Sequence, residues 1–337
     1  MVSSFFADHE LEVQHLFLPD FPTHAYLVTA SYHSEAYAVE VVKAGQKQIG
    51  LATLSDLMDT QSDAIVAING GFFKEKGIPV HDVMINKHVV LAKTDVGPSL
   101  VIGDPVVAIE ETGYTGFVEW QNEQVPIHGV NTTRNENELV VYNAFFRDST
   151  GTNKYGVELG LRPVQENHLQ GGMKAVVERK WMFRGNNPIP PGLMMLSAHG
   201  KPSERLRQVT WGDTITVHHQ FSRGIRDAHS VLGGNVMLVK NGTIVPHGDQ
   251  RHPRTVVGVN TRKNKVFFLI VDGRSKESIG LSLAELARLC HQLNMTDALN
   301  LDGGGSSTLW VNNKVMNKPA SVTNERPIST AIMLKKR

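Results

Sequence analysis

The sequence predicts an α+β protein made mainly of strands: β-rich mixed sheets with a few packed helices, in a single catalytic domain whose site lies at glycine-rich strand ends. Three observations predict this class. Short β-branched runs alternate with turn residues over most of the chain. The clearest helical spacing of apolar residues is in 282–293. Two apolar runs each end in a polar side chain followed by consecutive glycines.

The first sixty residues are predicted to contain two or three antiparallel strands. Apolar and polar residues alternate in 11–18 and 36–42, which is typical of strands with one face in water. A short helix then begins near Thr53 or Ser55, either of which can cap its first turn. The next run, 64–68, is apolar on both faces and therefore predicts an interior strand.

Residues 1–60 are predicted to form an N-terminal β-rich segment and residues 61–337 the catalytic domain, with an inserted lobe at 95–130. Between 79 and 230, Gly, Asn and Pro separate short β-branched runs, and these residues favour turns. The predicted strands there are 89–91, 106–109, 139–142 and 214–217. Residues 184–192 are predicted to form a loop.

The helix of the last third has explicit start signals. Ser282 and Glu285 have the spacing of a capping box, and apolar residues follow at helical spacing up to Leu293. Cys290 lies on this apolar stripe and is interpreted as a small buried hydrophobic side chain.

Strands are predicted on both sides of this helix. The apolar run 265–271 is typical of a buried strand and ends at Asp272. A second run, 298–301, leads directly into Asp302. Two hydrophobic strands therefore end in an Asp-Gly pair.

The composition excludes several classes of function. The chain has 34 Lys and Arg against 33 Asp and Glu, a formal net charge of +1. Nucleic-acid binding is not expected, because it requires clustered positive charge. With 41% hydrophobic and 20% charged residues, large-scale disorder is excluded. The one cysteine cannot form an internal disulfide or a thiolate zinc cage.

The sequence contains no predicted membrane span and no export signal. No stretch approaches about 18 uninterrupted apolar residues. The first ten residues lack the basic and apolar segments of a secretory signal. A cytoplasmic protein is therefore expected, the alternative being an extracellular or cell-surface location reached by a signal-independent route. The sequence makes no prediction about oligomeric state.

Two segments combine a strand end, a polar side chain and consecutive glycines. They are Asn69-Gly70-Gly71 and Asp302-Gly303-Gly304-Gly305-Ser306-Ser307. Glycine lets a ligand approach the main chain closely, and successive N–H groups can bind an anion. The alternative is a pair of tight turns in which the polar side chains cap their own backbones. Because two such segments occur, and hydroxyl side chains follow the second, the sequence favours a binding site.

Arg254 and Arg274 are candidates for binding a phosphate group. Arg254 precedes the apolar run 256–259, and Arg274 follows the run that ends at Asp272. Guanidinium groups can share phosphate oxygens while main-chain amides of a glycine turn bind the others. The alternative is that both are solvated arginines at strand ends.

Asp272 and Asp302 are the candidate catalytic residues. If their strands are neighbours, the two carboxylates converge at one edge of a sheet. Two carboxylates can divide the roles of acid, base and nucleophile in glycosyl transfer, or share a divalent cation. The alternative is that each aspartate caps its turn. No cofactor is predicted, and the histidines show no informative metal-ligand spacing.

Taken together, these segments resemble the phosphodiester glycosidase family. The resemblance rests on the two glycine turns, the helix ending at Leu293, and four shorter motifs. These motifs are Gly233-Gly234, Arg254-Thr255, Asp272-Gly273-Arg274 and Glu325-Arg326-Pro327. In order and spacing it extends over roughly residues 60–334, and it is most specific at 64–73 and 298–308. Many bacterial relatives in this family are described as exopolysaccharide biosynthesis proteins.

The resemblance implies a hydrolase that cleaves a sugar-1-phosphodiester into free sugar and a phosphomonoester. The expected substrate is a small-molecule or glycan phosphodiester, and a bacterial or phage-type protein that acts on a wall, capsule or other glycan phosphate is expected. Asp302 or Asp272 would act at the anomeric carbon. The implied phosphate contacts are Arg254, Arg274, Gly303, Gly304 and Gly305, and the implied substrate contacts are Asn69, Gly70, Gly71, Ser306, Ser307, Glu325 and Arg326. The alternatives are a non-catalytic glycan-phosphate-binding module and a metal-dependent phosphodiesterase.

Overall fold

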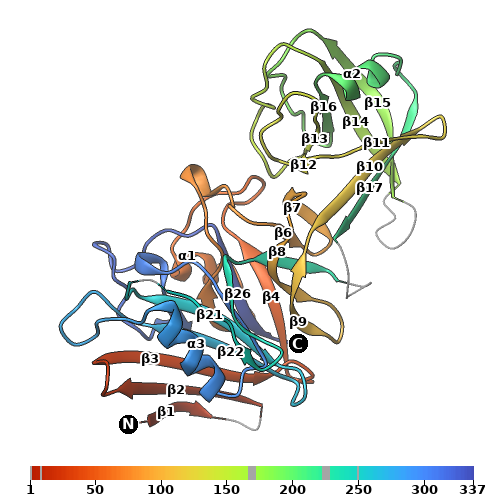
Figure 1. The fold of residues 1–337 in the computed structure, drawn as a ribbon. Helices are drawn as coiled ribbons and strands as arrows, with labels where there is room; N and C mark the ends of the chain where they lie inside the picture. The colour runs from red at the N-terminus through yellow and green to blue at the C-terminus, as the bar shows by residue number, and fades with distance from the viewer. Residues whose placement is uncertain (1, 8–9, 166–171, 222–227, 249) are drawn as a thin grey trace.

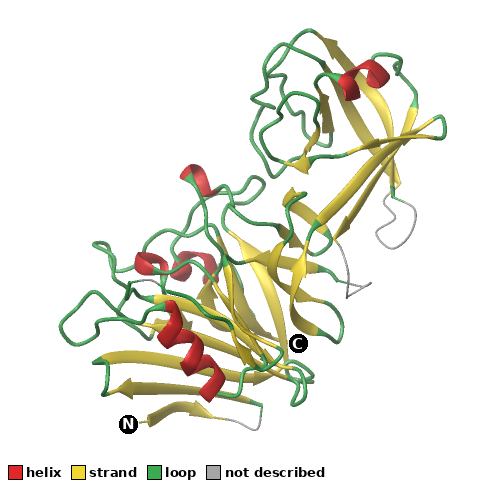
Figure 2. Cartoon of the chain, in the orientation of Figure 1, coloured by secondary structure: helices red, strands yellow, loops and turns green. Residues whose placement is uncertain are grey.

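The computed structural model describes residues 2–7, 10–165, 172–221, 228–248 and 250–337, which form three β-sheets. The predicted β-rich architecture is confirmed, and the chain is mostly β (Figure 2). The α+β label is not confirmed, because the helices that the structure describes are few and short. They are α1 (Leu54–Met58), α2 (Lys201–Leu206) and α3 (Leu283–Gln292), with 3-10 turns at Glu75–Gly77 and Gly304–Ser306.

The first sheet has eight antiparallel strands and contains the strand ends that carry the candidate site. Its order is β1 (Val2–Ala7), β2 (Leu11–Leu18), β3 (Thr23–Ser31), β22 (Lys265–Val271), β21 (Arg254–Asn260), β23 (Asp297–Asn300), β19 (Val236–Lys240) and β20 (Thr243–Ile244). Because β3 pairs with β22, the N-terminal strands and the C-terminal third share one sheet. Strands β22 and β23 both run antiparallel to β21, so their C-terminal ends lie at the same edge.

The second sheet has five strands and shares an apolar core with the first. Its order is β25 (Lys314–Val315), β24 (Leu309–Val311), β5 (Ala64–Asn69), β26 (Thr330–Lys336) and β4 (Tyr37–Lys43). Ile68 and Ile332 from this sheet and Val257 and Leu299 from the first belong to one cluster of buried side chains. This packing places the C-terminal end of β5 against the first sheet.

The third sheet has thirteen strands and extends from the lower body into an upper lobe (Figure 1). Its order is β11 (Glu123–Pro126), β10 (Tyr114–Trp120), β17 (Thr214–Phe221), β15 (Met173–Met182), β14 (Val157–Gln165), β16 (Met194–Ala198), β13 (Leu139–Tyr142), β12 (Gly129–Val130), β7 (His88–Lys93), β6 (Val83–Ile85), β18 (Ser230–Gly233), β8 (Gly97–Ile102) and β9 (Val107–Thr112). Only β12 and β13 pair in parallel among the described strands.

The upper lobe consists of β10 to β17 and α2 (Figure 1). Its strands supply most of one apolar cluster, including Leu159, Val177, Leu196 and Val217. The lobe predicted at 95–130 overlaps it only in part. That range also contains β8 and β9, which pair with each other and with β18 in the lower body.

Several elements predicted from capping residues and apolar runs form as expected. The capping box of Ser282 and Glu285 is formed at the start of α3, and Cys290 on its inner face is fully buried. Thr53 caps α1 by accepting a hydrogen bond from Asp56 N. The predicted strands at 64–68 and 265–271 correspond to β5 and β22.

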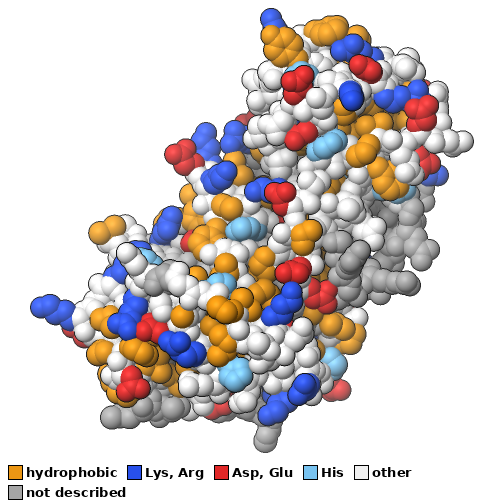
Figure 3. Space-filling view, in the orientation of Figure 1, with side chains coloured by type: hydrophobic (Ala, Val, Ile, Leu, Met, Phe, Trp, Pro, Cys, Tyr) orange, Lys and Arg blue, Asp and Glu red, His pale blue; other side chains and the backbone are white. Residues whose placement is uncertain are grey.

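The visible face of the molecule carries interspersed positive and negative side chains rather than one extended patch of a single sign (Figure 3). This pattern agrees with the nearly balanced charge of the sequence. In the part of the chain that the structure describes, no helix has the length and apolar character needed to cross a membrane.

Candidate active site

Two Asp-Gly turns lie side by side at one edge of the first sheet. Asp272 follows β22, and Asp302 lies just after β23, the two strands that flank β21. Both turns pack on Pro253, immediately before β21: a Cβ added at Gly273 would lie 2.9 Å from Pro253 N, and one added at Gly303 would lie 2.7 Å from Pro253 O. The antiparallel pairing with β21 therefore brings two sequence-distant turns together.

Asn69, at the end of β5, joins the second sheet to this edge. Its Nδ2 donates hydrogen bonds to Asp302 O at 2.7 Å and Gly70 O at 3.3 Å. Its Oδ1 accepts from Thr255 Oγ1 at 2.8 Å and Thr308 N at 3.2 Å. Asp302 N in turn donates to Gly70 O at 3.2 Å, so the two predicted glycine turns meet.

The Asn69 amide is fully buried, and protein groups engage both of its ends. The Asn69 amide can contact a sugar only if one of these hydrogen bonds to protein is replaced by one to the sugar. Gly70 N likewise donates to Thr330 O, and Gly71 N to Thr330 Oγ1, at 2.7 and 3.2 Å. This turn therefore positions its neighbours in the observed arrangement, and its predicted substrate contacts remain predictions.

Asp302 is a buried carboxylate with three groups that favour its ionised form. Burial raises its pKa, and the Ser306 hydroxyl, the Arg326 guanidinium and the Gly303 N–H oppose this rise. The Ser306 Oγ is itself buried and makes no hydrogen bond of normal geometry with the residues that the structure describes. An acceptor and a hydroxyl with unused hydrogen-bonding capacity therefore lie side by side.

Arg274 and Arg326 flank the glycine turn from two sides. A Cβ at Gly304 would lie 3.0 Å from Arg274 Nη2, and one at Gly305 would lie 3.6 Å from Arg326 Cδ. Gly304 has a φ of +62°, so glycine is favoured there by conformation as well as by space. Both arginines are exposed, and neither guanidinium donates a hydrogen bond to any residue that the structure describes.

Arg274 also has an unusual backbone. Its φ is +64°, in the left-handed region that costs a residue other than glycine roughly 1–2 kcal/mol. Such strain is concentrated at functional sites. The turn thus holds a cation beside the glycines at an energetic cost.

Arg254 differs from these two arginines. Its Nε donates to Leu281 O at 2.9 Å and its Nη2 to Gln250 O at 2.8 Å, and the residue is 8% exposed. The guanidinium fixes the main chain that leads into β21. Its predicted phosphate contact remains a prediction.

Asp272 is held more tightly than Asp302. Asn317 Nδ2 donates to its Oδ1 at 2.9 Å, and Lys318 N donates to its Oδ2 at 3.2 Å. Burial raises the pKa of Asp272, and the contacts from Asn317 and Lys318 oppose the rise. The same Asn317 Nδ2 donates to Ser307 O at 2.9 Å, which ties the two Asp-Gly turns together. No sequence pattern singled out Asn317.

The remaining predicted contacts have protein partners. Glu325 accepts from Ser55 N at 3.0 Å and Ser55 Oγ at 2.6 Å, and so supports the start of α1. Ser307 Oγ is buried and lies within hydrogen-bond distance of Thr255 Oγ1, at 3.2 Å. The Gly304 N–H donates to Pro253 O at 2.9 Å and is occupied in this arrangement.

In the described ranges, no group of three or more His, Cys, Asp or Glu side chains is arranged to hold a metal ion. The Asp272 carboxylate accepts a hydrogen bond from the Asn317 amide, whereas Arg326 acts on Asp302 through its charge alone.

The chain is similar to proteins of known family. The family described as phosphodiester glycosidase matches residues 135–335. Two curated relatives, the N-acetylglucosamine-1-phosphodiester alpha-N-acetylglucosaminidases of Bos taurus and Mus musculus, are 30% and 29% identical over 109 residues. Each match covers 27% of this chain and about a fifth of the relative, 20% and 21% respectively.

Two solved structures share the fold. A hypothetical protein from Synechocystis has a TM-score of 0.80 at 18% identity, over 100% of this chain and 64% of that chain. A putative exported protein from Burkholderia pseudomallei K96243 has a TM-score of 0.72 at 18% identity, over 93% of this chain and 74% of that chain. At this identity the likeness establishes the fold alone.

Proposed function

The chain belongs to the phosphodiester glycosidase family, and from this premise we propose that it hydrolyses a sugar-1-phosphodiester, releasing the sugar and leaving a phosphomonoester. One observation carries the proposal. The buried Asp302 carboxylate lies on a glycine turn flanked by two exposed arginines, Arg274 and Arg326, whose guanidinium groups donate no hydrogen bond to the described residues.

Asp302 is the group proposed to act at the anomeric carbon, as nucleophile or as base for water. A carboxylate in either role must be ionised, and Arg326, Ser306 and the Gly303 N–H all favour that form. Its main chain is fixed by Asn69, so the carboxylate is held at a defined position. The Ser306 hydroxyl is enclosed by protein, so its predicted contact with a substrate oxygen requires a local rearrangement.

Arg274 and Arg326 are proposed to bind the phosphate. A phosphomonoester leaving group requires stabilisation of negative charge more than protonation, and fixed guanidinium donors supply it. Arg254 and Asp272 then support the site, Arg254 by holding the strand entry and Asp272 through Asn317. The glycosidic C–O bond breaks, and the oxygen of water becomes part of the sugar.

The proposed substrate class is a glycan or cell-surface polysaccharide phosphate. N-acetylglucosamine-1-phosphodiesters are the first to test, because the curated relatives are named for that activity. The purified protein is incubated with UDP-N-acetylglucosamine and with methyl diesters of several sugar-1-phosphates, and free sugar is measured. Release that is abolished in Asp302→Asn supports the proposal.

Two other outcomes would contradict it. Binding of the diesters without turnover would indicate a non-catalytic glycan-phosphate-binding module. Hydrolysis in heavy-oxygen water that places label in the phosphate would indicate P–O cleavage, as expected for a phosphodiesterase, whereas label in the sugar supports C–O cleavage.

A further inference from the structure

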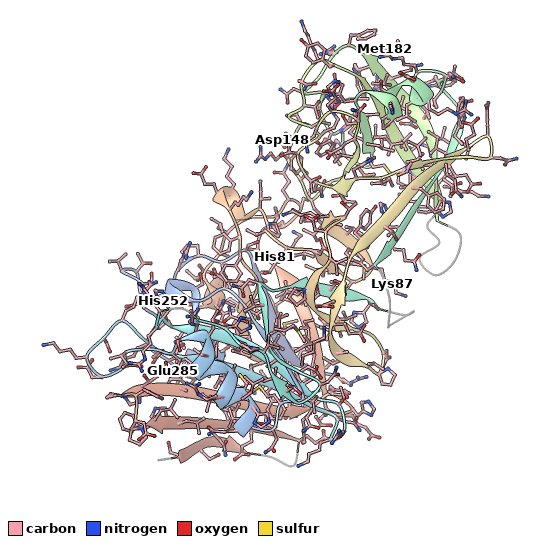
Figure 4. The ribbon with its side chains drawn as sticks, viewed as in Figure 1. His81, Lys87, Asp148, Met182, His252 and Glu285 are labelled. Carbon is pink, nitrogen blue, oxygen red and sulfur yellow. The ribbon has the colours of Figure 1, made fainter. Side chains whose placement is uncertain are left out.

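A cavity of about 310 Å³ lies beside the glycine turns, and none of the roles proposed above uses it. Its lining comes from residues 80–82, from residue 93 with 95–99, and from residues 233–235. Its size is at the lower end of ligand pockets, ~300–1,000 Å³, which suits a single small ring. His81, on its lining, lies in the lower body near the strands that lead into the upper lobe (Figure 4).

One wall of the cavity is continuous with the candidate active site. Gly71, in the turn of Asn69, packs so closely on Gly233 that an added Cβ would lie 2.8 Å from Gly233 O. Asn300, two residues before Asp302, donates from Nδ2 to Asn235 Oδ1 at 2.8 Å. A ligand in the cavity therefore lies next to the strand ends that carry Asp302.

Asp82 is the buried charged residue of this cavity. It is 7% exposed, and its Oδ1 accepts a hydrogen bond from Lys93 N at 2.8 Å. Its Oδ2 accepts no hydrogen bond from any residue in the described ranges. This oxygen is also not fully enclosed by protein atoms. One carboxylate oxygen is therefore available to a ligand.

The charges of the cavity favour a neutral, hydroxyl-rich ligand over a phosphate. Two carboxylates, Asp82 and Asp95, line it against one ammonium group, that of Lys93, which donates to Val80 O at 2.6 Å. Val96 and Pro98 add apolar surface, which suits the C–H face of a sugar ring. The exposed cations of the neighbouring turn, Arg274 and Arg326, are better placed for the phosphate.

We propose that this cavity is the subsite that holds the sugar ring of the phosphodiester, with Asp82 accepting hydrogen bonds from its hydroxyl groups. The assignment rests on the proposed function for the identity of the ligand. Asp82 is a specificity residue in this scheme, because it contacts the ring and not the bond that breaks.

Gly97 offers a way to block the cavity without disturbing the fold. It lines the cavity, a Cβ added to it meets no atom within 4 Å, and its φ lies outside the left-handed region. Gly97→Trp should therefore fill the cavity. The matched control is Thr94→Trp, which adds a large side chain at an exposed position just before β8, outside the lining.

The test measures binding of free N-acetylglucosamine, glucose and galactose by NMR titration, with inorganic phosphate as a separate probe. At least one sugar should bind the wild type, and Gly97→Trp and Asp82→Asn should each weaken that binding at least tenfold. Thr94→Trp should change it less than twofold, and phosphate binding should change less than twofold in all three variants. Failure of every sugar to bind, or unchanged binding in both cavity variants, would overturn the proposal.

Binding should also depend on pH through Asp82. Burial raises the pKa of Asp82 to about 7, with Asp95 adding to the rise and Lys93 opposing it. The other titratable groups near it are His81, whose pKa burial lowers, and Tyr114, whose pKa burial raises. The ionised carboxylate is the better acceptor, so sugar binding should weaken from pH 8 to pH 6 in the wild type. In Asp82→Asn this dependence should disappear, and its persistence would contradict the assignment.

These results can be separated from a failure of the proposed function. If sugars bind in the cavity but no sugar-1-phosphodiester is cleaved, the subsite stands and the hydrolase does not. If diesters are cleaved but Gly97→Trp leaves KM unchanged, the hydrolase stands and the subsite does not.

Discussion

Two turns of the lower body share one local pattern, an apolar strand followed by Asp and Gly, yet their carboxylates have different surroundings. The oxygens of Asp272 accept hydrogen bonds from the side chain of Asn317 and the main chain of Lys318. Asp302 faces Ser306, whose hydroxyl has no partner of normal geometry among the described residues, and Arg326, which is exposed. The difference shows that the strand end supplies the carboxylate, while the residues packed around it determine which groups it contacts.

The comparison is tested most strongly by Asp302→Asn. Removal of the nucleophile or base should reduce kcat by about 10³-fold or more. The melting temperature should change by only a few degrees, because the main-chain contact with Asn69 is retained. Steady-state kinetics and thermal unfolding check this, and activity within tenfold of the wild type would remove Asp302 from the chemistry.

Arg274→Gly separates two properties of this residue, the strain of its left-handed backbone and its proposed contact with the phosphate. Loss of a fixed phosphate donor should reduce kcat/KM by about 10²-fold. The free energy of unfolding should rise by about 1 kcal/mol, because glycine adopts the φ of +64° without strain. Arg274→Ala is the matched control: it should lose the same activity without this gain, and a gain of equal size would contradict the strain argument.

Asp272→Ala should have the opposite profile to Asp302→Asn. It leaves the donors of Asn317 and Lys318 without their carboxylate, so the free energy of unfolding should fall by about 1–3 kcal/mol. Below the melting temperature, kcat should fall less than tenfold. Denaturant unfolding and kinetics measure the two effects, and a loss of kcat comparable to that of Asp302→Asn would make Asp272 a catalytic residue.

The smallest expected effect is on the pH profile. Because burial raises the pKa of Asp302, the acidic limb of kcat/KM should lie above the usual range of an aspartate. Arg326→Ala removes a charge that favours the ionised form, so the limb should move to higher pH. Arg251→Ala, at an exposed arginine paired with Glu285, should leave the limb in place. A limb that moves equally in both variants would indicate a general charge effect.

Much of the fold could be predicted because its signals are local. The capping box at Ser282, the apolar run of β22 and the run of β5 each depend on residues close in sequence. The extent of the upper lobe could not be predicted in this way. Strand β8 joins the lower body by pairing with β18, whereas β10 joins the upper lobe by pairing with β17, and both pairings link segments far apart in the sequence.

The site shows the same division. Glycine runs and Asp-Gly pairs predicted the segments that form the candidate site, and the structure brings Asn69, Thr255 and Asp302 together. The sequence could not show that Arg254 is used by main-chain carbonyls, or that Asn317 holds Asp272. These partners are set by how separate segments pack, and a single asparagine outside any motif gives no signal.

The buried amide of Asn69 makes the molecule suited to a two-fragment assay. Its partners Thr255, Asp302 and Thr308 are 186, 233 and 239 residues away along the chain. A cut in the loop 184–192 of the upper lobe puts Asn69 on one fragment and these three partners on the other. The C-terminal fragment carries Asp302 but lacks Asn69, which holds the main chain of Asp302 in place, so sugar release only on mixing would report that the halves had reassociated.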